Sequence, residues 1–373
     1  MKEKILKWIF LATMGGLIIA ACNNVHTQNA EEESIPIPDK ISDSLVLMFY
    51  NVENLFDTID DLRHNDNAFL PGGMYLWTTD KYKQKIHNIA KVIHHFAHHK
   101  QPPMVIGLAE VENAKVLHDL VSDSLLRPYH YQYIHFESPD FRGIDVALLY
   151  RKPFKVFFQK PIKVNYYGGK KPRRLRDILI VGGQIPEDTL FVIVNHWPSQ
   201  RKGEQRSEPE REAAARAMLN AIKHLHDHYS KPKIIIMGDF NENPNGKAIQ
   251  NSLHPRRKRT TSTEWYAPLT TIWNPSRTGS SRYKNRWNLF DQIFINSPLL
   301  NTVTKSDTSS HWTVIGAGIY RASFLLRKNR INRSFWGTDF DPNGYSDHLP
   351  VYVKLGRVAS LETRQQNEAK KSQ

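Results

Sequence analysis

A carboxylate and an amide follow a short apolar segment in the second half of the chain. Residues 233–244 read KIIIMGDFNENP, so that four apolar residues precede Gly238, Asp239 and Asn241. The apolar residues predict a short buried strand, and the two polar side chains would then project from the end of a sheet. A carboxylate beside an amide at such a position can orient a water molecule and hold a phosphate oxygen. The same residues are common in turns, and this segment by itself supports both interpretations.

Two further polar side chains follow predicted strands in the first third of the chain. Asn51 ends the mostly apolar segment 44–51, and Glu110 follows the apolar segment 103–109. A carboxylate at a strand end is a suitable ligand for Mg²⁺, which usually takes one or two carboxylates and leaves other positions to water and phosphate. Asn51 is compatible with support of a metal ligand or with contact to phosphate, but an isolated asparagine at this place is more typical of a turn.

A histidine and an arginine complete the residues selected from local sequence. Segment 190–194 predicts a strand that delivers Asn195 and His196, and Arg142 precedes another predicted strand. A histidine changes its protonation near neutral pH, and an arginine can bind a phosphate through two parallel hydrogen bonds. Taken alone, the histidine favours a structural role, and Arg142 is equally compatible with a plain turn.

Helices are predicted between these strands. The apolar spacing predicts one helix that runs to about residue 99, with Thr79 or Asp80 as its N-cap, and the sequence predicts another within about 204–228. The first helix carries five histidines, but no carboxylate or cysteine completes a set of metal ligands, so we interpret them as a solvated polar face. The alternation of strands and helices predicts an α/β architecture, in which ligands gather at strand ends.

Six short motifs occur in a fixed order between Tyr50 and Pro350: YNVEN, LAEVEN, VNHWP, MGDFNENP, FDQIFI and YSDHLP. In this order they resemble the endonuclease/exonuclease/phosphatase superfamily, which includes pancreatic-type deoxyribonucleases, abasic-site endonucleases, inositol-phosphate 5-phosphatases and neutral sphingomyelinases. The resemblance implies an α/β (α+β) fold, a four-layer α/β/β/α sandwich in which two mostly antiparallel sheets pack face to face between helices. It also implies a divalent-metal-dependent phosphoesterase.

The resemblance also implies roles for particular residues. The metal would be Mg²⁺, with Mn²⁺ or Ca²⁺ as alternatives. Asp239 would position or deprotonate the attacking water, and Asn241 would hold the phosphate. His348 would lie against the phosphate, oriented by Asp291, and His196 would lie near the leaving group; which histidine is acid and which is base stays open. The expected metal residues are Asn51, Glu110 and Asp347, the expected catalytic residues are His196, Asp239, Asn241, Asp291 and His348, and the expected substrate contacts are Arg142, Asn195 and Asn241.

The N-terminal segment predicts export. Three lysines precede an apolar run over residues 9–21, which is followed by Cys22, the only cysteine. The run is shorter than the roughly 20 apolar residues of a membrane-spanning helix. Residues 19–22, IAAC, resemble a bacterial lipobox, which implies a lipid on Cys22; an uncleaved anchor and an ordinary secretory signal are the alternatives. We predict a signal peptide over 1–21, a lipidated tether over 22–42, one domain over 43–356 and a polar tail over 357–373.

The composition favours an anionic partner. The formal net charge is +14, and basic and aromatic residues alternate in segments 254–288 and 320–340. We predict an exported, monomeric nuclease or phosphodiesterase that acts on nucleic acid or another polyanionic phosphate ester. Its lipid anchor would place it in a membrane, expected to be the outer membrane on the periplasmic or surface face. A phosphatase or sphingomyelinase-like esterase is the alternative. A non-catalytic anion-binding module is less consistent with the sequence, because an anion binder gains nothing from burying several carboxylates together.

Overall fold

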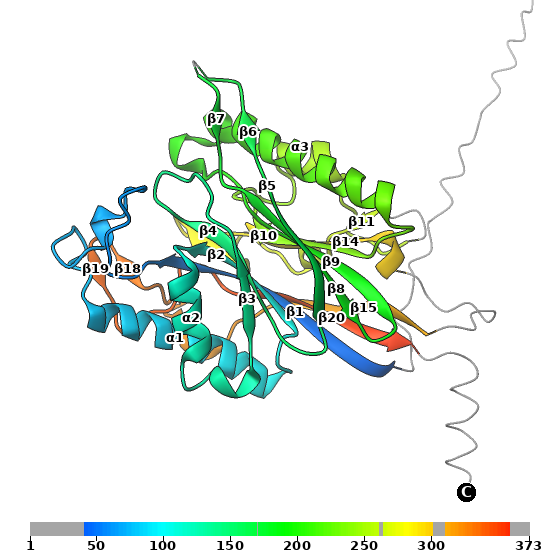
Figure 1. Ribbon diagram of the computed structural model, residues 1–373, viewed down its shortest axis with the longest axis horizontal. Coiled ribbons are helices and arrows are strands. Elements are labelled where there is room, and N and C mark those ends of the chain that lie inside the picture. The colour runs from blue at the N-terminus through cyan, green and yellow to red at the C-terminus, as the bar shows by residue number, and fades with distance from the viewer. Residues whose placement is uncertain (1–40, 170, 261–263, 301–309, 359–373) are drawn as a thin grey trace, which may run out of the picture. The chain divides into compact units, whose positions relative to one another are not determined.

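The computed structural model describes residues 41–169, 171–260, 264–300 and 310–358 (Figure 1). The predicted signal peptide, Cys22 and nearly all of the predicted tether lie outside these residues, so lipid attachment stays a prediction. The described domain begins with strand β1 at Ile41 and ends with strand β20 at Val358, and these two residues pair with each other. The paired strands extend two residues beyond the predicted domain at each end. Among the described helices, none has the length and apolar content that a membrane crossing requires.

The first large sheet has six strands around a central parallel pair. In spatial order they are β15 (His311–Ile319), β20 (Val351–Val358), β1 (Ile41–Leu55), β2 (Val105–Val111), β4 (Asp145–Tyr150) and β3 (Gln132–His135). Only β1 and β2 run parallel in this sheet, and its other neighbouring strands are antiparallel. Parallel neighbours carry their carboxyl ends to the same edge of a sheet, so β1 and β2 end side by side.

The second large sheet repeats this arrangement. In spatial order its strands are β11 (Trp265–Tyr266), β14 (Asp291–Asn296), β10 (Ile234–Asp239), β9 (Asp188–His196), β8 (Ile178–Ile185) and β5 (Lys155–Ile162). Only β9 and β10 are parallel here, again at the centre of the sheet. The prediction of two mostly antiparallel sheets is confirmed.

The two sheets pack face to face through an apolar core. Phe49 on β1 lies in the same buried cluster as Val194 on β9 and Met237 on β10. The approach is closest at Gly107 on β2, where an added Cβ would lie 2.8 Å from Met237 Sδ and 3.2 Å from Val194 Cγ1. Only a residue without a side chain fits at this point without displacing its neighbours, so Gly107 fixes how closely β2 approaches the opposite sheet.

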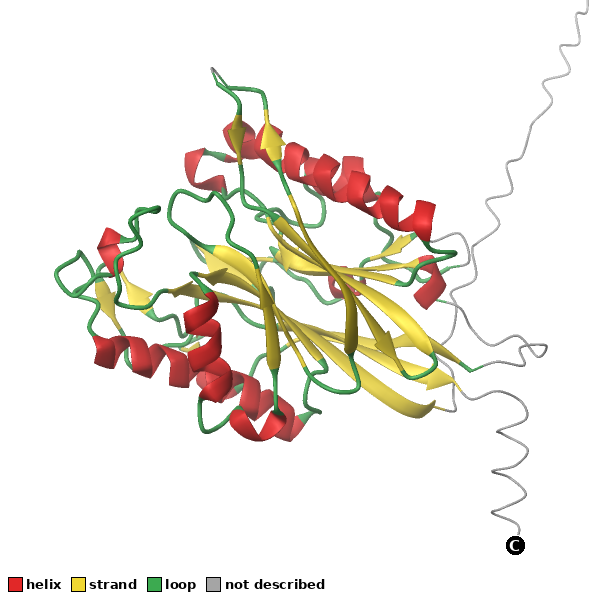
Figure 2. Ribbon diagram, in the orientation of Figure 1, coloured by secondary structure: helices red, strands yellow, loops and turns green. Residues whose placement is uncertain are grey.

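Helices cover the outer faces of both sheets (Figure 2). Helix α1 (Thr79–His99) and helix α2 (Ala114–Ser122) bury their apolar sides in one cluster with β1 and β2. Helix α3 (Glu204–His228) and helix α4 (Lys247–Leu253) do the same against β9 and β10. The four layers that the resemblance implied are therefore present, and the two longer helices lie in the predicted segments. The N-cap of the first is Thr78, one residue before the predicted Thr79, because the Thr78 side chain accepts a hydrogen bond from the backbone N–H of Lys81.

Short hairpins replace the open loops that the basic-aromatic segments suggested. Strand β12 (Ser281–Tyr283) pairs with β13 (Arg286–Asn288), and β16 (Leu326–Arg327) pairs with β17 (Arg330–Ile331). Strand β18 (Phe335–Trp336) pairs with β19 (Asp339–Phe340), and β6 (Asn165–Tyr166) pairs with β7 (Arg173–Arg174). Part of the aromatic content is structural, because the side chains of Trp265 and Trp287 are buried. Exposed basic side chains such as Lys284 and Arg286, at the tip of β12–β13, are the part available to a partner.

Candidate active site

Three side chains of the second sheet meet because of strand register. Asp239 is the last residue of β10, and it pairs with His196, the last residue of β9, and with Asp291, the first residue of β14. Residues paired directly across neighbouring strands project to the same face. The sequence had suggested that Asp239 lies on the turn after the strand. The pairing shows that it belongs to the strand itself. Asn241 is the turn residue, with a positive φ of 48°.

The first sheet contributes residues from the ends of β1 and β2, where the backbone leaves regular strand geometry. The pairing register shifts after Asn51, and Glu53, Asn54 and Glu110 have φ values of 53°, 54° and 65°. Irregularities of this kind redirect side chains at the rim of a sheet. Here they allow the Glu110 carboxylate to accept a hydrogen bond of 2.9 Å from the backbone N–H of Asn54.

The Asp239 carboxylate is the centre of the site. Its Oδ2 atom accepts a hydrogen bond of 3.0 Å from Asn51 Nδ2, and it lies 3.7 Å from His196 Nε2 and 3.8 Å from His348 Nε2. Its Oδ1 atom accepts the backbone N–H of Asn241 at 2.9 Å. Burial raises the pKa of Asp239 to about 7, although the charge of His348 opposes this rise. Two oriented donors thus hold a carboxylate that can take up a proton near neutral pH.

His348 is held as a cation by a buried carboxylate. Its Nδ1–H donates to Asp291 Oδ2 at 2.6 Å, and Asp291 is fully buried. Burial works against the charged ring, but Asp291 and then Asp239 outweigh it and raise the pKa of His348 well above its usual value. The Nε2–H of the protonated ring therefore faces Asp239 and Asp347, whose nearest oxygens lie 3.8 and 3.9 Å away.

His196 has the opposite electrostatic environment. Burial, followed by the positive charges of Arg176 and Arg142, lowers the pKa of His196 well below its usual value. Its Nδ1 atom is buried and has no hydrogen-bond partner within the described part of the chain. Its backbone carbonyl accepts a hydrogen bond of 3.1 Å from Arg176 Nε, which fixes this arginine behind the ring. His196 is therefore a neutral imidazole beside Asp239.

The carboxylates of Glu110 and Asp347 suit a hard divalent cation. Both side chains are partly open, with 15% and 37% of their surface exposed. Oxygen ligands of this kind, few in number and open to water, match the requirements of Mg²⁺. Asn51 Nδ2 donates to Asp239 and to Glu110 Oε1 at 3.4 Å, while Asn51 Oδ1 accepts the backbone N–H of Glu53. Asn51 orients the two carboxylates, and the second lone pair of its Oδ1 stays available, so its place at the metal stays a prediction.

The sequence reasoning missed a basic support behind Asp347. Arg333 Nη2 lies 3.2 Å from Asp347 Oδ2 and 3.0 Å from Glu53 Oε1, and Glu53 also accepts the backbone N–H of Ser334 at 2.7 Å. The buried Lys85 donates to the backbone carbonyl of Tyr345 at 3.0 Å. Glu53 lies two residues after Asn51 in a motif already selected, so its position was a usable signal. Arg333 belongs to a generally basic segment and has no distinctive local pattern.

Two of the predicted substrate contacts have other partners. Asn195 is fully buried, and its Oδ1 accepts the indole N–H of Trp197 at 3.1 Å. Because the side chain has no exposed surface, it cannot contact a substrate, and its hydrogen bond to Trp197 stabilises the end of the strand. Asn241 Nδ2 donates to the carbonyl of Trp197 at 2.9 Å, which leaves its second amide hydrogen for another acceptor. Arg142 is partly exposed and donates to Asn54 Oδ1 at 3.4 Å, at the edge of the site.

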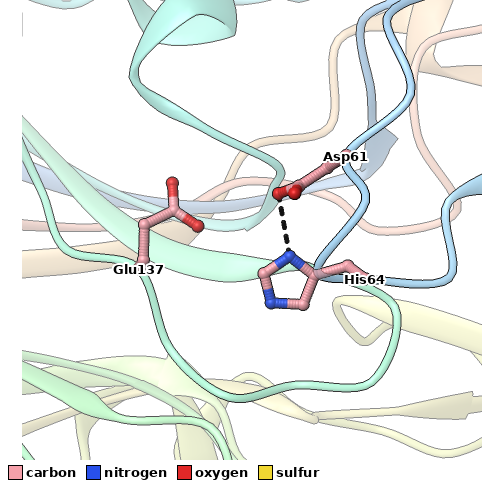
Figure 3. A group of neighbouring side chains, drawn as sticks. All are labelled: Asp61, His64 and Glu137. Atoms are coloured by element: carbon pink, nitrogen blue, oxygen red, sulfur yellow. Dashed lines mark hydrogen bonds and ion pairs between the residues drawn. The ribbon is translucent and has the colours of Figure 1, made fainter.

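A second group of possible metal ligands lies outside this site (Figure 3). His64 Nδ1 lies 2.9 Å from Asp61 Oδ2, and Glu137 is the third member of the group. Arg63 forms ion pairs with both carboxylates, at 2.9 Å from Asp61 and 3.7 Å from Glu137. The negative charge of this group is therefore already balanced by the protein, and we assign it no metal.

A comparison with protein families identifies the family of this chain. The sequence profile of the Endonuclease/Exonuclease/phosphatase family matches residues 46–357, so the chain belongs to that family. Members of this family are generally hydrolases that act on phosphate esters, and they include metal-dependent nucleases and phosphodiesterases. A comparison with curated proteins gave no match.

Several solved structures are similar to this chain. A family protein from Bacteroides thetaiotaomicron is 16% identical, over 84% of this chain and 98% of its own, with a TM-score of 0.50. The human nocturnin catalytic domain with a bound sulfate anion is 15% identical, over 84% of this chain and 95% of its own, also with a TM-score of 0.50. Truncated TDP2 from Caenorhabditis elegans is 16% identical, over 84% and 97%, with a TM-score of 0.48. At these identities the likeness to the first two structures shows the fold.

Proposed function

We propose that this protein hydrolyses phosphodiester bonds with water as the nucleophile and a divalent cation as cofactor. One observation carries the proposal: Asp239 Oδ2 lies 3.7 Å from His196 Nε2 and 3.8 Å from His348 Nε2. An oxygen atom beside such a pair can lie within hydrogen-bonding distance of both members. A water molecule or a phosphate oxygen placed beside the carboxylate could therefore hydrogen-bond to it and to one of the two rings.

Asp239 is the residue suited to accept the proton of the attacking water. A general base works best when its pKa is close to the working pH, and burial raises the pKa of Asp239 to about 7. The hydrogen bonds from Asn51 and from the Asn241 backbone keep its two oxygens in fixed positions. A fixed carboxylate can aim the water at phosphorus in line with the departing oxygen.

The two histidines serve the phosphate in different ways. His348, protonated and held by Asp291, places a positive N–H where negative charge grows on the phosphate oxygens during attack. His196 donates a hydrogen bond as a neutral ring and would lie towards the leaving oxygen. The second amide hydrogen of Asn241 can add another donor to the phosphate.

Glu110 and Asp347 would hold the cation, which we propose to be Mg²⁺, with Mn²⁺ or Ca²⁺ as alternatives. When bound, a divalent cation offsets phosphate charge as a Lewis acid. Asn51 keeps Glu110 in place through its Nδ2 atom. Arg333 keeps Asp347 in place through an ion pair of 3.2 Å. These supports hold the two carboxylates in position before the cation arrives.

The surface around His348 supports a polyanionic substrate, and we propose nucleic acid. The hairpin β12–β13 begins beside this histidine, because Ser281 forms a β-bridge with His348. Its tip exposes Tyr283, Lys284 and Arg286. Alternating basic and aromatic side chains bind phosphates and stack on bases, which suits a strand better than a small phosphomonoester. A phosphatase or sphingomyelinase-like activity is the alternative outcome of the assay below.

We further propose that the protein is exported and anchored through a lipid on Cys22, and that it works as a monomer at the membrane surface. The apolar N-terminal run followed by IAAC supports this proposal. Mass spectrometry of the protein expressed in a bacterial host tests it. A mature chain that begins at an acylated Cys22 supports the anchor, and an unmodified Cys22 contradicts it.

The catalytic proposal is tested with the full chain in mild detergent and Mg²⁺, with and without EDTA. Plasmid DNA, bis(p-nitrophenyl) phosphate and p-nitrophenyl phosphate are compared for the wild type, Glu110→Ala and His348→Ala. We expect cleavage of plasmid and diester that EDTA and both substitutions suppress. Cleavage of the monoester alone assigns a phosphatase instead. The proposed site is contradicted if both variants keep full activity. It is also contradicted if the wild type hydrolyses none of the esters at any Mg²⁺ concentration.

A further inference from the structure

An open pocket of about 400 Å³ is lined in part by Pro198 and Ser199, which follow His196 closely in the chain. It is formed by the loop before β4, the hairpin β6–β7 and the turn at Gln200–Lys202. Five arginines and one aromatic ring contribute to its lining: Phe141, Arg142, Arg173, Arg174, Arg176 and Arg201.

The pocket wall is bonded directly to the active site. Arg142 donates to Asn54 Oδ1 at 3.4 Å, and the backbone N–H of Asn54 holds the Glu110 carboxylate. Arg176 donates to the backbone carbonyl of His196 at 3.1 Å. A ligand in the pocket would therefore lie one or two residues away from the groups that surround the reacting phosphate.

Three of the arginines are already neutralised by carboxylates of the protein. Such pairs make a rigid basic frame, but they have little charge left for a ligand. The pairs are Arg173 with Glu210, Arg174 with Asp177 at 2.7 Å, and Arg176 with Asp140 at 2.8 Å.

The other two arginines keep their charge available. The nearest carboxylate oxygen to Arg142 is Asp140 Oδ1, at 3.9 Å, and Asp140 is already paired with Arg176. Arg201 is exposed, and it forms no hydrogen bond or ion pair with any residue in the described part of the chain. The neighbouring Gln200 donates to the carbonyl of Asn241 at 2.9 Å, which ties this turn to the active site.

We propose that the pocket binds a second phosphate group of the substrate, next to the one that is cleaved, through Arg142 and Arg201. This inference rests on the proposed phosphodiesterase function and names its substrate class: nucleotide chains or nucleoside bisphosphates. Guanidinium groups bind phosphate oxygens through paired, charge-assisted hydrogen bonds. Phe141, with 73% of its surface exposed, offers a ring on which the intervening base can stack.

The test compares dinucleotide esters that differ only in a second phosphate. Thymidylyl-(3′→5′)-thymidine is compared with its two bisphosphate forms, which carry the second phosphate on the 5′ or on the 3′ terminal hydroxyl. Both pairs are needed because either direction of the strand can carry the second phosphate into the pocket on the leaving-group side. The full chain is assayed with Mg²⁺, and kcat/KM is measured for each ester.

We expect one phosphorylated ester to exceed its partner about tenfold or more, since a hydrogen bond to a charged group is typically worth at least that factor. Arg201→Gln should reduce this ratio at least about tenfold, mainly through KM. Arg216→Gln is the matched control, because Arg216 lies on α3 outside the pocket with 67% of its side chain exposed. The control should keep the ratio of the wild type.

Two results overturn the inference while the catalytic proposal stands. One is EDTA-sensitive hydrolysis with no preference for a second phosphate in either pair. The other is an equal change of the ratio in Arg201→Gln and Arg216→Gln. If no ester is cleaved, the catalytic proposal fails, and calorimetric binding of thymidine 3′,5′-bisphosphate in EDTA decides about the pocket. Weaker binding by Arg201→Gln than by Arg216→Gln supports it, and equal binding overturns it.

The chain length of the substrate separates two sources of the same chemistry. A trinucleotide ester that is preferred further over the bisphosphate ester assigns the pocket to a nucleic-acid strand. A preference that is already complete at the bisphosphate assigns it to a small nucleotide. Both results retain the second phosphate as the group that the pocket recognises.

Discussion

The two histidines of the site lie at nearly equal distances from one carboxylate oxygen and yet differ in charge. His196 Nε2 is 3.7 Å and His348 Nε2 is 3.8 Å from Asp239 Oδ2. His348 is bonded to a buried carboxylate, which raises its pKa despite burial. His196 is buried next to Arg176 and Arg142, which lower its pKa together with burial.

The difference shows that protonation in this site depends on the residue behind each ring. The carboxylate that both rings face is shared, so it cannot distinguish them. Asp291 lies behind His348 at 2.6 Å, whereas Arg176 is bonded to the carbonyl of His196. One ring is thereby kept as a positive donor to a developing negative charge, and the other as a neutral donor. Substitutions of the two histidines and of the two carboxylates bonded or close to them test this division.

Replacing the charged ring should cost the most. We expect His348→Ala to reduce kcat for bis(p-nitrophenyl) phosphate on the order of 10³- to 10⁴-fold, because both a positive charge and a hydrogen bond in the transition state are lost. His98→Ala is the matched control, since His98 is an exposed histidine of helix α1. A smaller loss than in His196→Ala would reverse the roles assigned to the two rings.

Replacing Asp291, the carboxylate bonded to His348, should make the catalytic effect of His348 depend on pH. Asp291→Asn keeps an oxygen near His348 Nδ1 but removes the negative charge, so the pKa of His348 falls. Since the protonated ring is the active form, activity should then be lost as the pH rises through the lowered pKa. We expect a loss on the order of 10²-fold at pH 8 that shrinks towards pH 6. A pH profile of kcat/KM parallel to that of the wild type contradicts this.

Replacing the neutral ring should cost less. We expect His196→Ala to lower kcat on the order of 10- to 10²-fold, as for the loss of one neutral donor. His196→Gln can still donate a hydrogen bond and should recover part of that loss. The comparison is made at one pH and at saturating Mg²⁺. If the glutamine variant is as impaired as the alanine variant, the ring does more than donate a hydrogen bond.

The smallest effect concerns stability and the shared carboxylate. The folded protein raises the pKa of Asp239 to about 7 from its model-compound value of 3.8. The folded state then binds this proton more tightly than the unfolded state, so stability falls as the pH rises from about 4 to 7. In EDTA, Asp239→Asn should therefore be more stable than the wild type at pH 8, by on the order of 2 kcal/mol, and not at pH 4. Urea unfolding at both pH values measures the difference, and a difference independent of pH contradicts the raised pKa.

Local sequence predicted the elements well because their patterns are local. The runs of apolar residues at 103–109 and 190–194 became the central strands β2 and β9, and the two longer helices lie in the predicted segments. The secondary structure of such a segment follows from the spacing of its own apolar residues, which sets the face that can be buried. The basic-aromatic segments have no such pattern, and they fold as hairpins because residues such as Trp287 pack into the domain.

Residue types at strand ends were also available from sequence, but their orientations were not. Asn51 lies at the centre of the site, yet its Nδ2 faces two carboxylates. Asn195 lies beside His196 in sequence but points into the core, because successive residues of a strand project to opposite faces. A correct strand therefore does not tell which of two neighbouring polar residues reaches the substrate.

The sequence by itself determined the alternation of strands and helices, the ordered motifs that place this chain in its family, and the basic charge that favours a phosphate-rich partner. Only the tertiary structure decided which charged groups lie next to each histidine. Asp291 and His348 are 57 residues apart in the sequence, and Arg176 and His196 are 20 residues apart. A pKa depends on burial and on charges within a few ångströms, and those distances exist only once the two sheets have packed.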